Sequence, residues 1–261
     1  MKVRLDAAVA GRNNITRSQA RSLIMEGRVS VNGTVATKAG QNVPTDAAIV
    51  VAQARRFVSR GGEKLERALD EFGIDVSGAE ALDVGASTGG FTDCLLQRGA
   101  KSVTAIDVGY GQLDWRLRND ARVHVMERTN FRRLADDAFP AGFDLIVIDA
   151  SFISLRTILA RAAGYLREDG AIVALVKPQF EAGRERVGSG GVVRDRATHA
   201  DVLRELRAAA LSLGLRPIRL TSSPLIGPAG NREFLIELRP GVGTPFGDAR
   251  IDAVLDEGGR R

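Results

Sequence analysis

The 261-residue chain has few of the residues that build disulfides and metal sites. Cys94 is its only cysteine, and His124 and His199 are its only histidines. A single cysteine excludes a disulfide framework and a cysteine-rich metal site. The two histidines have no H-x-x-x-H spacing, so a histidine-built metal centre is disfavoured. We therefore expect no bound metal.

Long apolar segments are also absent. No apolar run approaches the ~20 residues that span a bilayer. Residues 1–6 lead into arginine and asparagine, whereas a secretion signal has a long apolar core followed by a cleavage site. We therefore expect a cytoplasmic, soluble protein with no membrane partner, and a monomer.

The charge of the chain is unevenly distributed. The net charge is +5, from 37 Lys and Arg against 32 Asp and Glu. Residues 1–60 hold ten basic and three acidic side chains, a net of +7, and the other 201 residues hold 27 against 29, a net of −2. A basic segment of this kind usually binds nucleic acid or another polyanion.

The amino-terminal segment has the pattern of a small α+β module. An apolar stripe from Leu5 to Val9 predicts a short helix that is broken at 11–14. Thr16 and Gln19 have capping-box spacing, which predicts a helix over 17–26 that stops at Gly27. Residues 29–35 contain an Asn-Gly pair, which favours a hairpin with a type I′ turn, and 49–51 predicts one more strand.

This segment resembles the S4 RNA-binding module at 4–6, 16–24 and 27–33. A solvated helix face is the alternative interpretation of Arg17 and Arg21, but the local charge and the helix–hairpin order favour RNA. The resemblance implies that structured RNA is held through helix shape and phosphates, which agrees with arginines that lack interleaved aromatic residues. The candidate RNA-binding residues are Arg4, Arg17, Arg21, Arg28, Arg55 and Arg60.

From Glu63 onward, helices alternate with strands that are almost continuously apolar, as a parallel sheet buried on both faces requires. The pattern predicts a doubly wound α/β domain, in which ligands bind at the carboxyl ends of the strands. We expect strands at 81–86, 102–107, 123–126, 143–149, 171–177, 216–222 and 233–239, and helices at 90–98, 154–167 and 196–213.

Two strand ends indicate a nucleotide-type cofactor. Residues 83–92 form a glycine-rich loop, which lets the backbone approach a ligand closely, but they lack both the G-x-G-x-x-G spacing and a P-loop. Asp107 ends the next strand, where a carboxylate can bind both ribose hydroxyls. This is the arrangement of an S-adenosylmethionine site. The alternative is two strand-end acids that cap neighbouring helices.

Features that the sequence lacks argue against two classes of methyl acceptor. Cys94 is the only possible nucleophile for pyrimidine C5 methylation, and it lies within a predicted helix as a small buried thiol. The loop at 149–152 has no D/N-P-P-Y/F motif for amino-nitrogen methylation. An oxygen acceptor needs a base, and Lys177, one of only five lysines, ends an apolar strand where partial burial would favour a neutral amine. A lysine that snorkels from the strand end is an equal alternative.

Motifs spread over nearly the whole chain carry a closer resemblance, at 59–65, 83–92, 105–113, 128–130, 149–155, 176–181 and 227–234. With these motifs the chain resembles the TlyA family of S4-domain rRNA 2′-O-methyltransferases, whose catalytic domain is similar to FtsJ/RrmJ. The family's interdomain R-x-W-V motif is represented by 55–58, with Phe57 in place of tryptophan. Members have also been labelled haemolysins, but the chain shows no spanning or strongly amphipathic apolar segment.

The resemblance implies the functional residues. The K-D-K-E tetrad falls on Lys64, Asp149, Lys177 and Glu233, with Lys177 taking or orienting the proton of a ribose 2′-OH, a cytidine in ribosomal RNA being the expected acceptor. The alternative function is an RNA-binding ribosome assembly factor without essential catalysis. The candidate S-adenosylmethionine contacts are Asp83, Gly85, Ala86, Ser87, Thr88, Gly89, Gly90, Phe91, Asp107 and Asp149.

These inferences predict the domain organisation. We expect an S4-like RNA-binding domain over 1–52 and a linker over 53–60. A Rossmann-like, S-adenosylmethionine-dependent methyltransferase domain should then occupy 61–240, and a tail 241–261. The partners expected are ribosomal RNA and ribosomal subunits.

Overall fold

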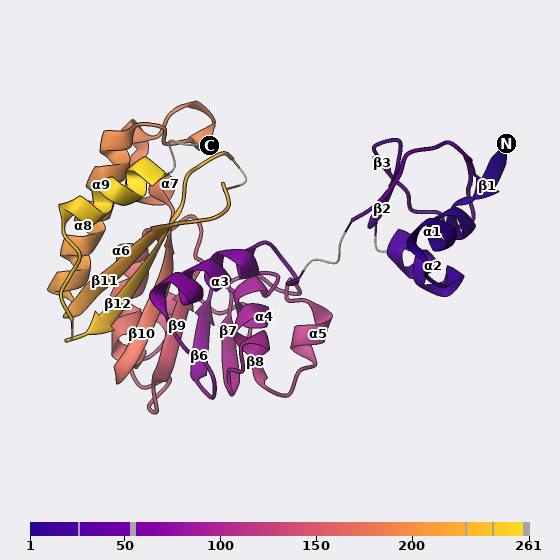
Figure 1. Ribbon diagram of the computed structural model, residues 1–261. Helices are drawn as coiled ribbons and strands as arrows, with labels where there is room; N and C mark the ends of the chain where they lie inside the picture. The colour runs from indigo at the N-terminus through magenta and orange to yellow at the C-terminus, as the bar shows by residue number, and fades with distance from the viewer. Residues whose placement is uncertain (26, 53–55, 228, 242, 258–261) are drawn as a thin grey trace. The chain divides into compact units, whose positions relative to one another are not determined.

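The computed structural model describes all residues except 26, 53–55, 228, 242 and 258–261. The chain divides into two compact units, Met1–Arg56 and Phe57–Arg261. Residues 53–55 of the expected linker lie outside the described residues, whereas 57–60 belong to the second unit. Each unit is described by itself (Figure 1).

The first unit is a small α+β fold with its own apolar core. Leu5 and Val9 of one helix pack with Ala20 and Ile24 of the next, and all four side chains are fully buried. Antiparallel pairing gives a two-stranded sheet, β1–β4, and a three-stranded sheet, β3–β2–β5. The elements are β1 (Lys2–Arg4), α1 (Leu5–Asn13), α2 (Arg17–Met25), β2 (Val29–Val31), β3 (Thr34–Val35), β4 (Asn42–Pro44) and β5 (Ile49–Val51).

Local sequence signals set most of these boundaries. Thr16 and Gln19 form the expected capping box, because Thr16 N donates to Gln19 Oε1 (2.9 Å) and Gln19 N to Thr16 Oγ1 (3.2 Å). Asn32 and Gly33 both have positive φ, as a type I′ turn requires. The expected break at 11–14 was wrong in position: α1 continues through Gly11 and ends only at Asn14, whose left-handed backbone (φ 52°) terminates the helix.

The second unit is built on a seven-stranded sheet in the order β11-β12-β10-β9-β6-β7-β8. Strands β6 to β10 are mutually parallel, and β12 runs antiparallel between β10 and β11. This confirms the predicted doubly wound α/β class. The strands are β6 (Glu80–Val84), β7 (Ser102–Ile106), β8 (Val123–Met126), β9 (Phe143–Ile148), β10 (Leu166–Val176), β11 (Leu215–Ser222) and β12 (Phe234–Pro240).

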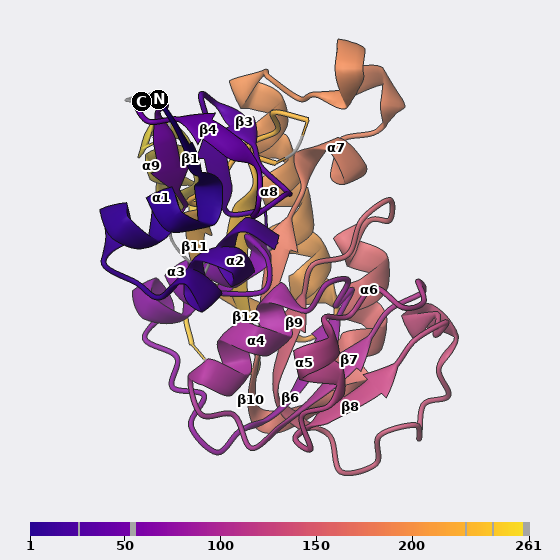
Figure 2. The ribbon, with the colours of Figure 1, turned by 90° about the vertical axis from the view of Figure 1, so that its right-hand side faces the viewer.

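Helices cover both faces of the sheet, because side chains alternate between the two faces along each strand. Two buried apolar clusters hold these helices. Residues of α3, α4 and α5 belong to one cluster, and residues of α6, α8 and α9 belong to the other (Figure 2). The helices are α3 (Gly61–Phe72), α4 (Gly90–Gln97), α5 (Trp115–Arg118), α6 (Leu155–Ala162), α7 (Pro178–Glu181), α8 (Arg196–Ser212) and α9 (Asp248–Glu257), with 3₁₀ turns at Phe131–Arg133, Ala163–Tyr165, Arg184–Arg186 and Ser189–Gly191.

The strand order reverses between β6 and β9. The chain goes outward from β6 through β7 to β8 and then returns to the other side of β6. Loops that leave neighbouring strands in opposite directions create a crevice at such a point, and ligands of open α/β sheets bind there.

Candidate active site

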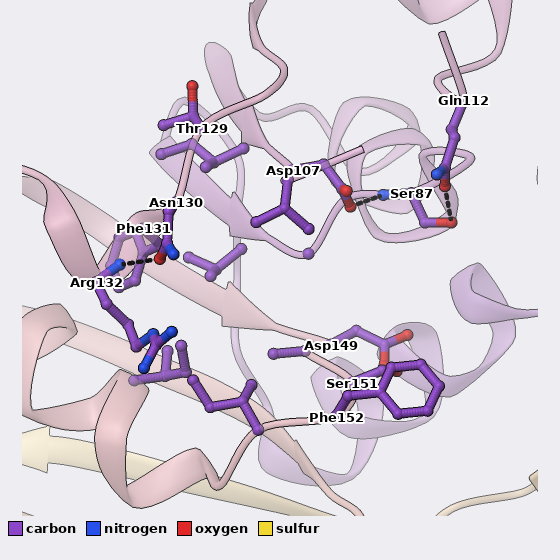
Figure 3. A pocket seen from close by; sticks show the side chains of 17 residues that line it. Ser87, Asp107, Gln112, Thr129, Asn130, Phe131, Arg132, Asp149, Ser151 and Phe152 are labelled. Carbon is purple, nitrogen blue, oxygen red and sulfur yellow. Dashed lines mark hydrogen bonds between the residues drawn. The ribbon is translucent and has the colours of Figure 1, made fainter. Parts of the chain in front are cut away.

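A cavity of about 480 Å³ lies at the carboxyl ends of β6, β7 and β9 (Figure 3). Its polar side chains include Ser87, Asp107, Asn130 and Asp149, and its apolar wall includes Ile158. A mostly apolar cavity with a few convergent polar groups is typical of small-molecule sites. The full lining is Val84, Gly85, Ser87, Ile106, Asp107, Val108, Gln112, Thr129, Asn130, Phe131, Arg132, Asp149, Ala150, Ser151, Phe152, Ile153 and Ile158.

Asp107 follows β7 and is fixed in the cavity wall by backbone amides. Its Oδ2 accepts from Ser87 N (2.8 Å) and its Oδ1 from Gly109 N (2.7 Å), so the carboxylate bridges the two loops that frame the cavity. Ser87 Oγ in turn donates to Gln112 Oε1 (3.3 Å; Figure 3). The carboxylate is therefore held rigidly by its neighbours.

The glycine-rich loop contributes to the cavity with only part of its length. Of the predicted loop contacts, Gly85 and Ser87 line it. Asp83, Ala86, Thr88, Gly89, Gly90 and Phe91 do not. Gly89 (φ 93°) caps α4, and a Cβ there would lie 2.3 Å from the Leu117 side chain. Gly89 is therefore required by packing behind the loop.

Asp83, at the end of β6, is fully buried. Its Oδ2 accepts from Thr92 N (3.0 Å) and Thr92 Oγ1 (2.7 Å), and its Oδ1 meets no partner among the described residues. Burial raises the pKa of Asp83 to about 7, against the hydrogen bonds from Thr92, and the charges of Asp149 and Asp107 add to the rise.

Three of the four tetrad residues come together because of the strand register. Lys177 directly follows Val176 of β10, and Glu233 directly precedes Phe234 of β12, and these two strand residues are paired. Asp149 follows β9, which is the other neighbour of β10. Strand ends at one sheet edge thus place three tetrad residues side by side.

The tetrad forms two ion pairs. Lys64 Nζ of α3 lies 2.5 Å from Glu233 Oε2, and Lys177 Nζ lies 2.6 Å from Asp149 Oδ1. Lys64 and Lys177 are each 9% exposed and Glu233 is 3% exposed, so the Lys64–Glu233 pair is shielded from water, whereas the Asp149 side chain of the other pair is 24% exposed. Asp149 also lines the cavity, which joins the tetrad to it.

Two further residues at this edge had no predicted role. Ser151 Oγ accepts a hydrogen bond from Lys177 Nζ (2.8 Å), so the ammonium group has two anchors. Phe152 has a left-handed backbone (φ 63°), and its ring is 91% exposed and 5.1 Å from the ring of Phe180. Both residues lie within the motif at 149–155, which is the sequence signal that could have found them.

In the first unit, Arg4, Arg17 and Arg21 converge on Asp6, with N–O distances of 2.9 to 3.2 Å. Arg28 instead donates to Ala52 O (3.0 Å). The other two predicted RNA contacts lie elsewhere: Arg60 is exposed at the start of α3, in the second unit, and Arg55 lies outside the described residues. The structure therefore brings three of the six predicted arginines together.

The described part of the chain offers neither a membrane span nor a metal cluster. None of its helices has both the length and the apolar character needed to span a bilayer. Within the same residues, no group of three His, Cys, Asp or Glu side chains is placed to hold a metal ion. Cys94 is a fully buried thiol, as expected.

Comparison with known proteins identifies both parts of the chain. Residues 57–239 match the FtsJ-like methyltransferase family, and residues 3–49 match the S4 domain. The 16S/23S rRNA (cytidine-2'-O)-methyltransferase TlyA of Mycobacterium tuberculosis is 47% identical over 241 residues, which cover 91% of this chain and 90% of that protein. Hemolysin A of Brachyspira hyodysenteriae is 42% identical over 84% of this chain and 92% of its own length.

A solved structure resembles this chain over nearly its whole length. A protein from Streptococcus thermophilus that carries a hemolysin name has a TM-score of 0.77 and 41% identity, covering 99% of this chain and 96% of that one. Fold and site together define a methyltransferase with an amino-terminal S4 domain. The chain belongs to the TlyA family of FtsJ-like methyltransferases, as its sequence motifs indicated.

Proposed function

We propose that this chain is a cytoplasmic, S-adenosylmethionine-dependent methyltransferase that acts on the ribose 2′-OH of a cytidine in ribosomal RNA, within ribosomal subunits. The observation that carries the proposal is the two Lys–carboxylate ion pairs, both with largely buried lysines, beside the cofactor-sized cavity. The name of the M. tuberculosis relative supports the acceptor. We expect the chain to act as a monomer.

The cavity has the features that an adenosine-containing methyl donor requires. Gly85 (φ 86°) lets the glycine-rich loop lie against the backbone of Asp149, since a Cβ there would lie 2.8 Å from Asp149 O, and both residues line the cavity. Asp107 presents a fixed carboxylate to ribose hydroxyls. Ile106, Phe131 and Ile158 offer apolar contact to a base. When bound, S-adenosylmethionine supplies an electrophilic methyl group.

Lys177 is the residue that would handle the acceptor's proton. Ser151 and Asp149 hold its Nζ at the cavity edge, so the amine has a fixed direction when a 2′-OH enters. A neutral Lys177 would accept the hydroxyl proton, and an ammonium would orient the oxygen instead. Lys64 and Glu233, paired next to it, would position the ribose.

The pyrimidine-C5 alternative is disfavoured by accessibility. Cys94 is 0% exposed within α4 and lies in the apolar cluster that contains Leu95 and Val103. A thiol in such surroundings is inert as a nucleophile.

The proposal is tested by label transfer from radiolabelled S-adenosylmethionine to isolated ribosomal subunits. Lys177→Ala should lower the transfer by about 100-fold or more, the scale of a lost general base, while its cofactor affinity stays at the wild-type value. Lys101→Ala is the matched control, because Lys101 is exposed and paired with Glu80 away from the cavity.

Two results would contradict the proposal. Equal label transfer by wild type and Lys177→Ala would show that Lys177 takes no part in the reaction. No transfer by the wild type to any subunit would instead favour an RNA-binding assembly factor.

A further inference from the structure

We propose that Asp6 is a positioning residue that gathers Arg4, Arg17 and Arg21 into a single site for the phosphates of structured RNA. The inference rests on the proposed RNA-binding function and deepens it. It assigns to an acidic side chain a favourable role in holding a polyanion.

The three guanidinium groups reach the carboxylate from different elements. Arg4, at the end of β1, donates through Nε and Nη2 to the two oxygens (3.2 and 2.9 Å). Arg17, at the start of α2, donates through Nη2 to both oxygens (3.0 and 3.1 Å). Arg21, one turn further along α2, donates through Nε to Oδ2 (3.2 Å). Asp6 thus ties β1 and α2 to α1.

The carboxylate of this cluster is buried, whereas its three arginine side chains are half-exposed. Asp6 is 0% exposed, whereas the side chains of Arg4, Arg17 and Arg21 are 48%, 53% and 54% exposed. The guanidinium groups, that of Arg4 first, hold the pKa of Asp6 well below its usual range, so the carboxylate remains ionised. Three cations around one anion leave two excess positive charges at the surface.

Donors remain for a ligand. Each guanidinium has five N–H groups, and the hydrogen bonds to Asp6 occupy only one or two nitrogens of each arginine. Among the described residues, Nε and Nη1 of Arg17 and both Nη atoms of Arg21 meet no acceptor. Forked guanidinium donors suit phosphate oxygens, and here their geometry is fixed before RNA arrives.

Net charge and geometry predict opposite effects of removing the acid. If charge alone governs binding, Asp6→Asn adds one positive charge to the basic unit and should tighten RNA binding and steepen its salt dependence. If Asp6 positions the arginines, the same variant should weaken binding, because three guanidinium groups without their shared anion repel one another and separate.

The test measures binding of the full-length protein to an RNA hairpin with a double-stranded stem, over a series of salt concentrations. Asp6→Asn should bind about tenfold more weakly than wild type, with a shallower salt dependence. The matched control is Asp46→Asn, which makes the same charge change in the same unit at an exposed side chain that forms no ion pair among the described residues; the neighbouring Arg12 is held by the carbonyls of Thr45 and Ala47. It should bind as tightly as wild type or more tightly.

A second variant covers the case in which Asp6→Asn unfolds the first unit, which hydrogen exchange would detect. Arg17→Lys keeps the net charge and replaces a half-exposed side chain, but it loses the planar guanidinium whose Nη2 contacts both Asp6 oxygens while Nε and Nη1 stay open to a ligand. It should also weaken hairpin binding, by about fivefold. Wild-type affinity in a folded Asp6→Asn overturns the inference, and where Asp6→Asn unfolds, wild-type affinity in Arg17→Lys overturns it.

The double variant Arg17→Ala/Arg21→Ala distinguishes a failure of the role proposed for Asp6 from a failure of the proposed RNA-binding function. Weak binding by the double variant together with wild-type binding by Asp6→Asn overturns the role of Asp6 alone. Wild-type binding by the double variant overturns the RNA-binding function of this unit and the inference with it.

Discussion

At the scale of single residues, Asp83 is a buried acid that no cation neutralises among the residues described around it. Its folded-state pKa of about 7 exceeds the ordinary value of 3.8, chiefly because of burial. Between these two values the folded state holds a proton that the unfolded state releases. The free energy of unfolding should therefore fall as the pH rises through this range.

This predicts that Asp83→Asn removes part of the pH dependence of stability. The amide of the variant keeps an oxygen that can accept the hydrogen bonds from Thr92, and it does not ionise, so burial does not disfavour a charged form. Between about pH 5 and about pH 8, wild type should lose a few kcal/mol more of unfolding free energy than the variant does. Urea unfolding at several pH values, without cofactor, measures this. Asp169→Asn, at an exposed position near the start of β10, should keep the wild-type slope, and parallel slopes for Asp83→Asn and wild type would refute the prediction.

Residue identity in the site was predictable where motif and strand end coincide. Asp149 and Lys177 follow apolar strands, so their meeting at one sheet edge follows from the parallel topology. Ser151 and Asp6 were missed because their roles depend on side-chain direction: Ser151 turns to Lys177, and Asp6 turns inward beneath three arginines. No pattern in the sequence indicates the direction of either side chain.

At the scale of elements, the start of α3 depends on a close contact between Gly62 and Phe57. A Cβ on Gly62 would lie 2.2 Å from the Phe57 ring, which is 3% exposed, and Val58 N donates to Asp93 Oδ2 of α4 (2.8 Å). The segment before α3 is thus fastened to the helix that follows the glycine-rich loop.

Gly62→Ala should therefore destabilise the second unit by about 1–3 kcal/mol, since an added methyl group must displace a buried ring. Thermal unfolding of the full chain measures the loss. Gly164→Ala is the control, because a Cβ at Gly164 meets nothing within 4 Å. If both variants melt like wild type, the contact contributes nothing to stability.

Elements with a strong apolar pattern were predicted best, but no helix was expected over α3, and the helix expected over 154–167 ends at Ala162, with β10 beginning at Leu166. The predicted helix over 196–213 corresponds to α8 (Arg196–Ser212), and the predicted strand over 143–149 to β9 (Phe143–Ile148). The short strands β1 and β4 were not predicted, because three residues carry no detectable periodicity. Their pairing is set by contacts across the fold, from Lys2↔Pro44 to Arg4↔Asn42.

At the scale of the whole molecule, the two compact units match the division of charge. The first unit, Met1–Arg56, holds nine basic and three acidic residues, a net of +6, and the rest of the chain is close to neutral. RNA affinity and cofactor affinity should therefore be separable by mutation.

Arg17→Ala/Arg21→Ala should weaken binding to ribosomal RNA and reduce the magnitude of its log–log salt slope by about two, because two phosphates are no longer neutralised. Its affinity for S-adenosylmethionine should equal that of wild type. Filter binding over a salt series and calorimetry provide the two measurements. An unchanged salt slope would show that these arginines do not bind phosphate.

The position of β12 also has a consequence for biosynthesis. This strand enters the sheet between β10 and β11, both of which precede it in the chain, and it brings Glu233 to a lysine 169 positions earlier. The Lys64–Glu233 pair therefore cannot form until β12 has been synthesised and has left the ribosome. A nascent chain released before β12 would lack both a tetrad residue and the strand that covers the edge of β10, so the expected tetrad is complete only once synthesis has passed Glu233.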